Sequence, residues 1–250
     1  MALDMKKGSA LENIPREALP KHIGIIMDGN GRWAKRQGMP RKMGHRQGAK
    51  VFSDIAKYCR DIGIPYLTVY AFSTENWSRP KDEVDAIMNL LSEYLADIKK
   101  HKDENIRLCF LGEKSQLRPD LQTQIADIEE RSSKNDGITV NVALNYGGRD
   151  EIIRAVRKLA AQCAEGTLDP AQIDEKLLSD TLDTAGQPDP DMIIRSSGEM
   201  RTSNFLPWQS TYSEYILMNI LWPDFKPADL DRAILEYLQR SRRFGGVLEP

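Results

Sequence analysis

The chain of 250 residues is long enough for one sizeable α/β domain, and its net charge of −2 argues against a general affinity for nucleic acid. Its three cysteines are scattered and its three histidines lack metal-ligand spacing, which argues against a disulfide framework and a structural zinc site. No apolar run approaches 18 residues, and no signal-peptide core opens the chain. We therefore expect a cytoplasmic protein with reduced thiols.

Strands and helices are predicted to alternate along the chain. Residues 1–20 are expected to form a flexible leader, and residues 21–250 a single domain. The patterns predict strands at 22–28, 65–72, 105–112, 137–144, 191–198 and 214–221, and helices at 44–63, 81–101, 118–134, 150–165, 174–182 and 227–240. This alternation is typical of an α/β fold with a mostly parallel six-stranded sheet that helices flank on both faces.

The first strand and the residues after it are the most informative stretch. The strand runs into Asp28, after which Gly29 and Gly31 allow a tight turn and a close approach of the backbone to a ligand. Several cations follow, among them Arg32 and Arg41. A carboxylate among cations at the end of a buried strand fits a Mg²⁺-bound diphosphate, because aspartate suits the metal and arginine the phosphate oxygens. The alternative is a solvated basic loop after an ordinary strand.

Polar clusters follow four of the six predicted strands, at 28–32, 73–79, 145–149 and 195–203. The carboxyl ends of parallel strands meet at one edge of a sheet, so we expect these clusters to lie together. In the last cluster, Arg195, Arg201 and a serine suit a second anion site. The alternative is that the two arginines only pair with Glu199 or Glu214.

The strings HIGIIMDGNGRWA, GHRQGA, YAFSTENWSRP, NYGGRDEI and RSSGEMRTSNFLPWQSTYSEY resemble the cis-prenyltransferase family, most closely its bacterial undecaprenyl diphosphate synthases, over about residues 21–245. The resemblance implies Mg²⁺-dependent condensation of isopentenyl diphosphate onto an allylic primer, farnesyl diphosphate, with new Z double bonds. The implied product is undecaprenyl diphosphate, a carrier-lipid precursor for peptidoglycan and cell-wall synthesis. A homodimer, a hydrophobic tunnel for the growing chain and a peripheral membrane contact for product release are also implied.

The resemblance assigns roles to individual residues. Asp28 would position Mg²⁺ with Glu214 as a second ligand, and Asn76 matches the position usually offered as the proton acceptor. Since a neutral amide is a poor base, we expect Asn76 to orient the substrates while a diphosphate oxygen takes the proton. The allylic-diphosphate site would comprise Gly29, Asn30, Gly31, Arg32, Trp33, Arg41 and His45. A mobile loop that closes over both substrates would comprise Ser73, Thr74, Glu75, Asn76, Trp77 and Arg79. The isopentenyl-diphosphate site would comprise Arg195, Arg201, Thr202 and Ser203.

Two positions depart from the family pattern. Gly24 stands where alanine is common, and Met200 where some relatives carry a polar residue. A methionine is no useful ligand for Mg²⁺, which argues against a third protein ligand at that position.

The helix predicted at 81–101 carries an apolar stripe that directly follows the mobile loop. The stripe is Val84, Ile87, Leu91, Leu95 and Ile98, and the strand residues expected opposite it are Val69, Ala71, Val142 and Leu144. We predict that these residues form walls of the tunnel. The alternative is ordinary core packing.

Two other classes of function compete with this hypothesis. A phosphotransferase could use Asp28 as its nucleophile, as in hydrolases with a DxD strand end, but the second position here is Asn30. A non-catalytic partner subunit would lose site residues, whereas this chain keeps Asp28 and the cluster at 195–203. The chain also lacks the DDxxD pair of trans-type prenyl synthases.

Overall fold

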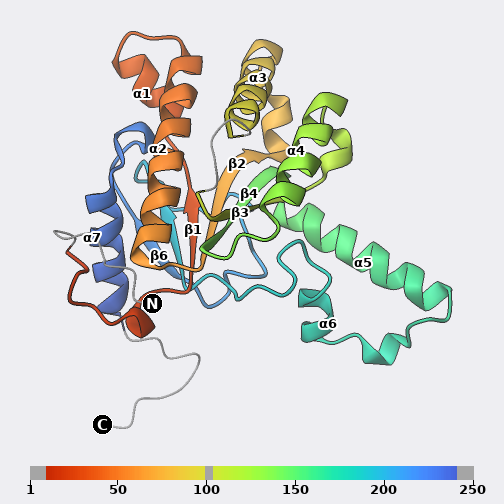
Figure 1. Ribbon diagram of the computed structural model, residues 1–250. Helices are drawn as coiled ribbons and strands as arrows, with labels where there is room; N and C mark the ends of the chain where they lie inside the picture. Colours follow the sequence, from red (N-terminus) through yellow and green to blue (C-terminus); the bar gives the residue numbers. More distant parts are fainter. Residues whose placement is uncertain (1–9, 99–103, 241–250) are drawn as a thin grey trace.

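The computed structural model describes residues 10–98 and 104–240, and these residues form one α/β domain (Figure 1). The six strands all run parallel in the order β3-β4-β2-β1-β5-β6. They are β1 (His22–Ile26), β2 (Tyr66–Ser73), β3 (Ile106–Leu111), β4 (Ile138–Tyr146), β5 (Met192–Arg195) and β6 (Glu214–Leu217). The helices are α1 (Asn30–Arg36), α2 (Arg41–Ile62), α3 (Lys81–Ile98), α4 (Pro119–Ser132), α5 (Gly148–Ala164), α6 (Glu175–Ser179) and α7 (Pro227–Leu238).

The two faces of the sheet are covered differently. On one face, strand residues such as Ile25 and Val69 pack in the main core with α2, α3, α4 and α7. On the other face, Tyr70 and Tyr146 pack against Phe205 and Leu206, which lie between β5 and β6. In Figure 1, α5 runs away from the sheet toward α6, so it covers little of either face.

The strand order confirms the expectation about the polar clusters. The four strands that end in them, β1, β2, β4 and β5, are neighbours at the centre of the sheet, in the order β4-β2-β1-β5. Since all pairs are parallel, the polar residues after these strands meet at one edge.

The largest difference from the predicted elements lies just after β1. Asn30–Arg36 forms the short helix α1 where a loop was expected, with Gly29 at φ 103° and the small Ala34 buried against α2. The two glycines and the polar composition of this stretch disguised the helix. The other elements end within a few residues of their predicted bounds, except that β6 stops at Leu217 and residues 99–101 of the predicted third helix lie outside the described residues.

The leader also differs from the prediction. Residues 1–9 are not among the described residues, but Leu11 and Leu19 are buried in the main core. From residue 10 onward the segment therefore packs on the domain. Among the described residues no helix combines the length and apolar character needed to cross a membrane.

Candidate active site

An ion pair between two neighbouring strand ends forms the centre of the site. Asp28 follows β1, and its Oδ2 accepts a 3.0 Å bond from Nη2 of Arg195, the last residue of β5. Its Oδ1 accepts a 3.2 Å bond from Arg32 of α1. Burial raises the pKa of the Asp28 carboxyl, but bonds from Arg195 and Ser197 and the charge of Arg32 outweigh it and hold the pKa below its ordinary value. Asp28 is thus a carboxylate at neutral pH.

The Arg195 guanidinium links this pair to the loop that follows β5. Its side chain is only 4 % exposed, and Nη1 donates to the Ser203 hydroxyl at 2.8 Å and to the carbonyl of Arg201. Its Nε is buried without a hydrogen-bond partner among the described residues. A buried guanidinium with an unused donor is a strong point of attraction for an anion.

Arg201 lies beside Arg195 but is held more loosely. Its side chain is 63 % exposed and pairs with Glu199 at 2.5 Å, while Glu199 also pairs with Arg32 at 3.2 Å. The alternative raised from the sequence therefore holds for Arg201 and fails for Arg195, which pairs with Asp28. Thr202 and Ser203 are exposed in the same loop. The exposed guanidinium can turn toward a ligand, whereas the buried one is already oriented.

The backbone of this loop is strained and firmly held. Ser197, Ser203, Asn204 and Leu206 are four of the six described non-glycine residues with positive φ. Such conformations are costly and persist where surrounding bonds impose them. Here the Asn204 carbonyl accepts from the Gly148 amide at 2.8 Å, and its Oδ1 accepts from the Arg149 amide at 2.9 Å. The start of α5 therefore holds the backbone of this loop at Asn204, next to Ser203.

A second group of cations gathers around Glu83, at the start of α3. Its carboxylate lies 3.1 Å from Arg79, 3.5 Å from Arg41 and 3.9 Å from His45 Nε2. Burial lowers the pKa of His45, as do the charges of Arg79 and Arg41, which outweigh the opposite effect of Glu83. His45 is therefore neutral at pH 7, and its buried Nε2 has no hydrogen bond to any of the residues that the structure describes.

Gly31 links the two cationic groups. A Cβ atom at Gly31 would lie 2.8 Å from Nε of Arg41, so a larger residue would displace that guanidinium. The next residue, Arg32, belongs to the group around Asp28. Helix α1 therefore places both groups on one continuous surface.

The predicted mobile loop forms a short 3₁₀ helix, Thr74–Ser78, between β2 and α3. Asn76 caps it, because its Oδ1 accepts a 3.1 Å bond from the Ser73 amide. Glu75 accepts from Asn204 at 2.9 Å, and the Trp77 indole donates to Asn145 at 2.7 Å. These bonds join the loop to the ends of β4 and β5.

Three residues expected at the allylic site mainly shape the backbone. Gly29 begins α1 with a positive φ, and a Cβ there would meet Leu221 at 2.8 Å. The Trp33 indole donates to Asp224 at 2.7 Å and ties α1 to the segment before α7. Asn30 donates to the Met27 carbonyl, while its Oδ1 is buried beside Gly48 and has no hydrogen-bond partner within residues 10–98 and 104–240.

Within one chain Glu214 lies far from Asp28, so the expected sharing of a metal by these two residues stays a prediction. Glu214 opens β6 and is level with Met192 at the start of β5, whereas Asp28 follows the far end of β1. About five residues of extended strand, roughly 16 Å, separate the two levels. Glu214 instead pairs with Arg240 at 2.9 Å.

The donor set fits a metal ion that arrives with a ligand. No group of three or more His, Cys, Asp or Glu that could hold a metal occurs in the described ranges. Asp28, however, is a partly exposed carboxylate beside two arginines, and each carboxylate oxygen can accept more than one partner. Because Mg²⁺ commonly uses one or two carboxylates together with waters and substrate phosphates, Asp28 suits this ion when a diphosphate is bound.

An apolar cavity of about 120 Å³ lies between α2, α3 and the sheet, with Asn30 and His45 at one end. Four residues of the predicted stripe line it, Ile87, Leu91, Leu95 and Ile98, together with Val69, Ala71 and Val142 of the sheet. Val84 and Leu144 are buried in the core instead. The predicted walls are thus largely confirmed as the lining of a cavity.

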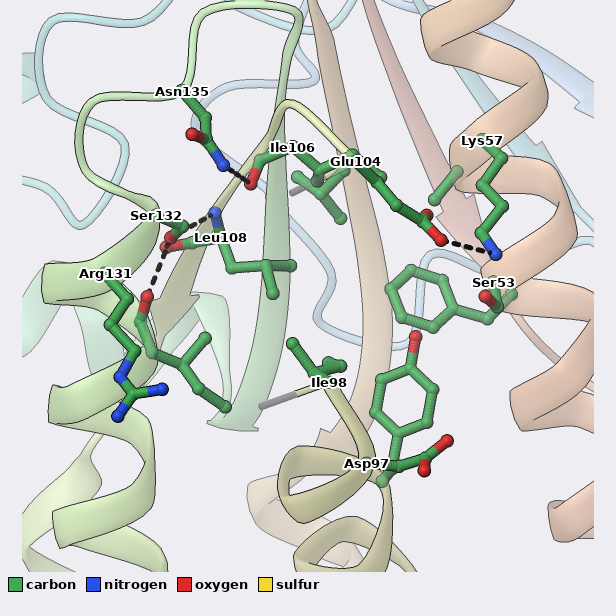
Figure 2. Close-up of a pocket in the computed structure, with 15 residues that line it drawn as sticks. Ser53, Lys57, Asp97, Ile98, Glu104, Ile106, Leu108, Arg131, Ser132 and Asn135 are labelled. Carbon is green, nitrogen blue, oxygen red and sulfur yellow. Dashed lines mark hydrogen bonds and ion pairs between the residues drawn. The ribbon is translucent and has the colours of Figure 1, made fainter. Parts of the chain in front are cut away.

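A second cavity, of about 380 Å³, continues from the first and shares Phe52, Tyr94, Ile98 and Leu108 with it. Figure 2 shows its charged border, where Lys57 of α2 pairs with Glu104 at 2.8 Å. The apolar space therefore begins at the cationic groups and ends at a polar rim.

Glu83 provides a direct test of the second cationic group. Its carboxylate neutralises Arg41 and Arg79 in the absence of a ligand, so it competes with a bound anion. We expect Glu83→Gln to bind inorganic pyrophosphate several-fold more tightly in calorimetry. The matched change Glu93→Gln, which breaks the exposed pair with Arg46, should leave the affinity unaltered. Weaker binding by Glu83→Gln would contradict this assignment.

A parallel α/β domain with two arginine-rich groups beside an apolar cavity fits an enzyme for diphosphates that carry apolar chains. The family model described as putative undecaprenyl diphosphate synthase matches residues 26–245. The chain therefore belongs to this prenyltransferase family, which confirms the resemblance seen in its motifs.

Individual relatives agree with this membership. The chain is 50 % identical to an isoprenyl transferase of Brucella suis, covering 91 % of this chain and 90 % of the relative, and 49 % identical to one of Clostridium tetani, covering 92 % and 90 %. Among solved structures, one similar protein is lavandulyl diphosphate synthase from Lavandula x intermedia, in complex with dimethylallyl diphosphate. It is 38 % identical with a TM-score of 0.88, and the match covers 92 % of this chain and 99 % of that chain. A probable undecaprenyl diphosphate synthase from Campylobacter jejuni is 34 % identical with a TM-score of 0.74, and the match covers 90 % of this chain and 98 % of that chain. The protein is a prenyltransferase.

Sequence reasoning missed several residues that shape the site. Glu83 could have been found, because Arg79 precedes it by four residues at a helix start, which is the spacing of an ion pair. Asn204 and Ser197 gave no such signal. Their roles depend on a positive φ and on contacts with Glu75 and Arg32 that are distant in sequence.

Proposed function

We propose that the protein condenses isopentenyl diphosphate with an allylic diphosphate primer, farnesyl diphosphate, and extends it to a long Z-polyprenyl diphosphate. The observation that carries this proposal is the ion pair between the buried Arg195 and the partly exposed Asp28, which stands beside a second cationic group and an apolar cavity. Undecaprenyl diphosphate, as a carrier-lipid precursor for cell-wall synthesis, is the product that we propose from the family relationship.

The primer would place its diphosphate between α1, α2 and the start of α3. Arg41, Arg79 and neutral His45 offer donors there, and the apolar cavity begins at the same residues. As the carbon–oxygen bond of the primer breaks, its electron pair leaves with the diphosphate. Arginines already in place stabilise that charge without reorganisation, which is the largest contribution expected of the protein.

Isopentenyl diphosphate would bind at the other anion site. Arg195 and Ser203 are fixed by their mutual bond, and Arg201 is free to turn inward from Glu199. Anchoring this diphosphate orients the alkene toward the allylic carbon, and the new carbon–carbon bond then forms within one bound pair. A diphosphate oxygen takes the proton released next, since Asn76 is a neutral amide whose Oδ1 already accepts from Ser73.

Asp28 would hold Mg²⁺ together with oxygens of a bound diphosphate. The ion supplies charge stabilisation to the departing diphosphate. Asp28 has a second function in this scheme, because its carboxylate also pairs with the Arg195 guanidinium and orients it.

The growing chain would occupy the apolar cavity along α3. The cavity leads from His45 past Ile87 and Leu91 to Ile98, and then into the larger cavity near Lys57. An apolar chain is favoured along this lining and disfavoured at the charged border.

Two copies of the chain are proposed to form a homodimer. Ile153 and Val156 are large apolar residues exposed on α5, the helix that projects from the domain, and Leu217 is exposed on the edge strand β6. Exposed apolar groups and an open edge are features that a partner commonly covers.

Arg201 tests the division into two diphosphate sites. We expect Arg201→Ala to raise the KM for isopentenyl diphosphate by about tenfold or more, with little change in the KM for the primer, because it removes a charged donor pair from one site only. Arg201→Lys should rescue poorly, since lysine lacks the planar fork. An equal rise in both constants would show that the sites are wrongly divided.

The function itself is tested by analysing products. Purified protein with farnesyl and isopentenyl diphosphates and Mg²⁺ should yield a ladder of prenyl diphosphates by mass spectrometry, and a chelator should abolish it. Failure to extend any allylic primer would refute the proposal. A stable aspartyl-phosphate at Asp28 would instead favour the competing phosphotransferase.

A further inference from the structure

The segment between β1 and the middle of α2 carries an unusual excess of positive charge. Residues 29–53 contain seven Lys and Arg and no Asp or Glu, although the whole chain has 35 basic and 37 acidic residues. Three of the seven, Arg32, Arg41 and Arg46, form ion pairs with carboxylates across the site and the α2–α3 cleft. Binding of substrates explains these three at most.

The lysines of this segment have no such partners. Lys35, Lys42 and Lys50 are exposed, and none forms an ion pair with a described carboxylate. Lys42 and Lys50 lie with Arg46 at a spacing of four residues, which puts them on one side of α2. The opposite side carries buried residues such as Gly48 and Val51, so the three cations face solvent. Helix α1 and the first turns of α2 project from the domain beside the strand ends (Figure 1).

Two methionines lie among these cations. Met39 is 42 % exposed in the connection between α1 and α2, and Met43 is 38 % exposed in the first turn of α2. Attraction of a small anion requires cations but no exposed apolar side chains. Flexible apolar groups surrounded by lysines are typical of a surface that enters the boundary between headgroups and acyl chains.

The same surface borders an opening of the apolar cavity. Met43, Arg41 and Arg46 line a cleft of about 580 Å³ between α2 and α3. This cleft shares His45, Ile87 and Leu90 with the apolar cavity. An apolar chain that leaves the cavity between α2 and α3 would therefore emerge next to Met43 and Lys42.

We propose that Met39, Met43, Lys35, Lys42 and Lys50 form a docking surface for a lipid bilayer that contains anionic lipids. The complementary charge selects the bilayer surface, and the methionines enter its apolar boundary. The proposal rests on the proposed function in one respect, since a long isoprenoid product gives the enzyme a reason to be at a bilayer. The charge, the exposed methionines and the adjoining cleft are independent of the reaction.

The test measures cosedimentation of the full chain with vesicles, without substrates. We expect binding to vesicles of phosphatidylcholine with about one third phosphatidylglycerol, weaker binding as salt is raised, and little binding to phosphatidylcholine alone. The variant Lys35→Glu/Lys42→Glu/Lys50→Glu should lose about tenfold or more in apparent affinity. Met39→Ser should also weaken binding, by about twofold or more, at unchanged net charge.

A matched triple variant separates the surface from net charge. Lys21→Glu/Lys134→Glu/Lys158→Glu changes three other exposed lysines by the same total charge and should retain wild-type vesicle binding. Equal losses in the two triple variants, or no binding by the wild type, would overturn the proposal. Binding of nucleic acid or heparin through the same lysines without vesicle binding would also overturn it. Because no substrate is present, these outcomes are independent of whether prenyl transfer occurs.

Discussion

Replacing Asp28 by alanine is expected to lower turnover by a factor of about 10² or more, because the change removes both the candidate metal ligand and the partner that orients Arg195. The substitution also lowers the stability of the fold, because the nearly buried Arg195 side chain loses its carboxylate partner. We therefore expect the melting temperature to fall by several degrees while the variant stays folded at assay temperature. Asp28→Asn should retain more stability and remain as inactive.

A control for the loss of an ion pair is Asp183→Asn. Asp183 is a partly buried carboxylate that pairs with Arg154 at 2.6 Å, outside both anion sites. The Asp183→Asn variant should lose stability to a similar degree as the Asp28 variants and keep the turnover of the wild type. Near-normal turnover of folded Asp28→Asn at saturating Mg²⁺ would contradict the assignment of Asp28.

The pH dependence of stability follows from the same pair. The lowered pKa of Asp28 means that its pairing stabilises the fold fully above the ordinary carboxyl value near pH 4, and that this contribution is lost only as pH falls through the lowered pKa. Asp28 therefore does not titrate in the range where activity is assayed.

Bulky residues in the lining of α3 are expected to shorten the product in order of their depth. Ile87, Leu91 and Leu95 follow one another along the cavity at steps of about 6 Å, so tryptophan at Ile87 should stop growth earliest and tryptophan at Leu95 latest. The shift should be read from the product ladder by mass spectrometry, together with the melting temperature of each variant.

Overpacking must be distinguished from blocking the cavity. Ile125 of α4 is buried in the main core and lines neither apolar cavity, so Ile125→Trp should cost about 1–3 kcal/mol without shortening the product. Unchanged product length in folded, active variants at all three α3 positions would mean that the stripe is only core.

The fold was predictable because its signals are local. Each strand is a short apolar run, and the polar clusters at 28–32, 73–79, 145–149 and 195–203 fall after the four central strands. The parallel arrangement then brings them to one edge without any knowledge of their contacts. Helix α1 was missed because its stability comes from Ala34 packing on α2 rather than from its own composition.

The pairing of side chains across the site was not predictable in the same way. Arg195 could as well have met Glu199 as Asp28, and only the adjacency of β1 and β5 decides between them. Glu214 illustrates the opposite case, in which a suitable carboxylate stands at the wrong end of its strand for a site within one chain. Residue type and spacing identify candidates, and strand order selects among them.

The most direct test is a crystal structure with Mg²⁺, isopentenyl diphosphate and an unreactive thio analogue of the allylic primer. We predict one diphosphate at Arg41 and His45, with its chain between α2 and α3 along Ile87 and Leu91, and the other diphosphate at Arg195 and Ser203, with the metal on Asp28. An exchange of the two diphosphates, or a primer chain lying outside the α2–α3 cavity, would contradict the proposed site.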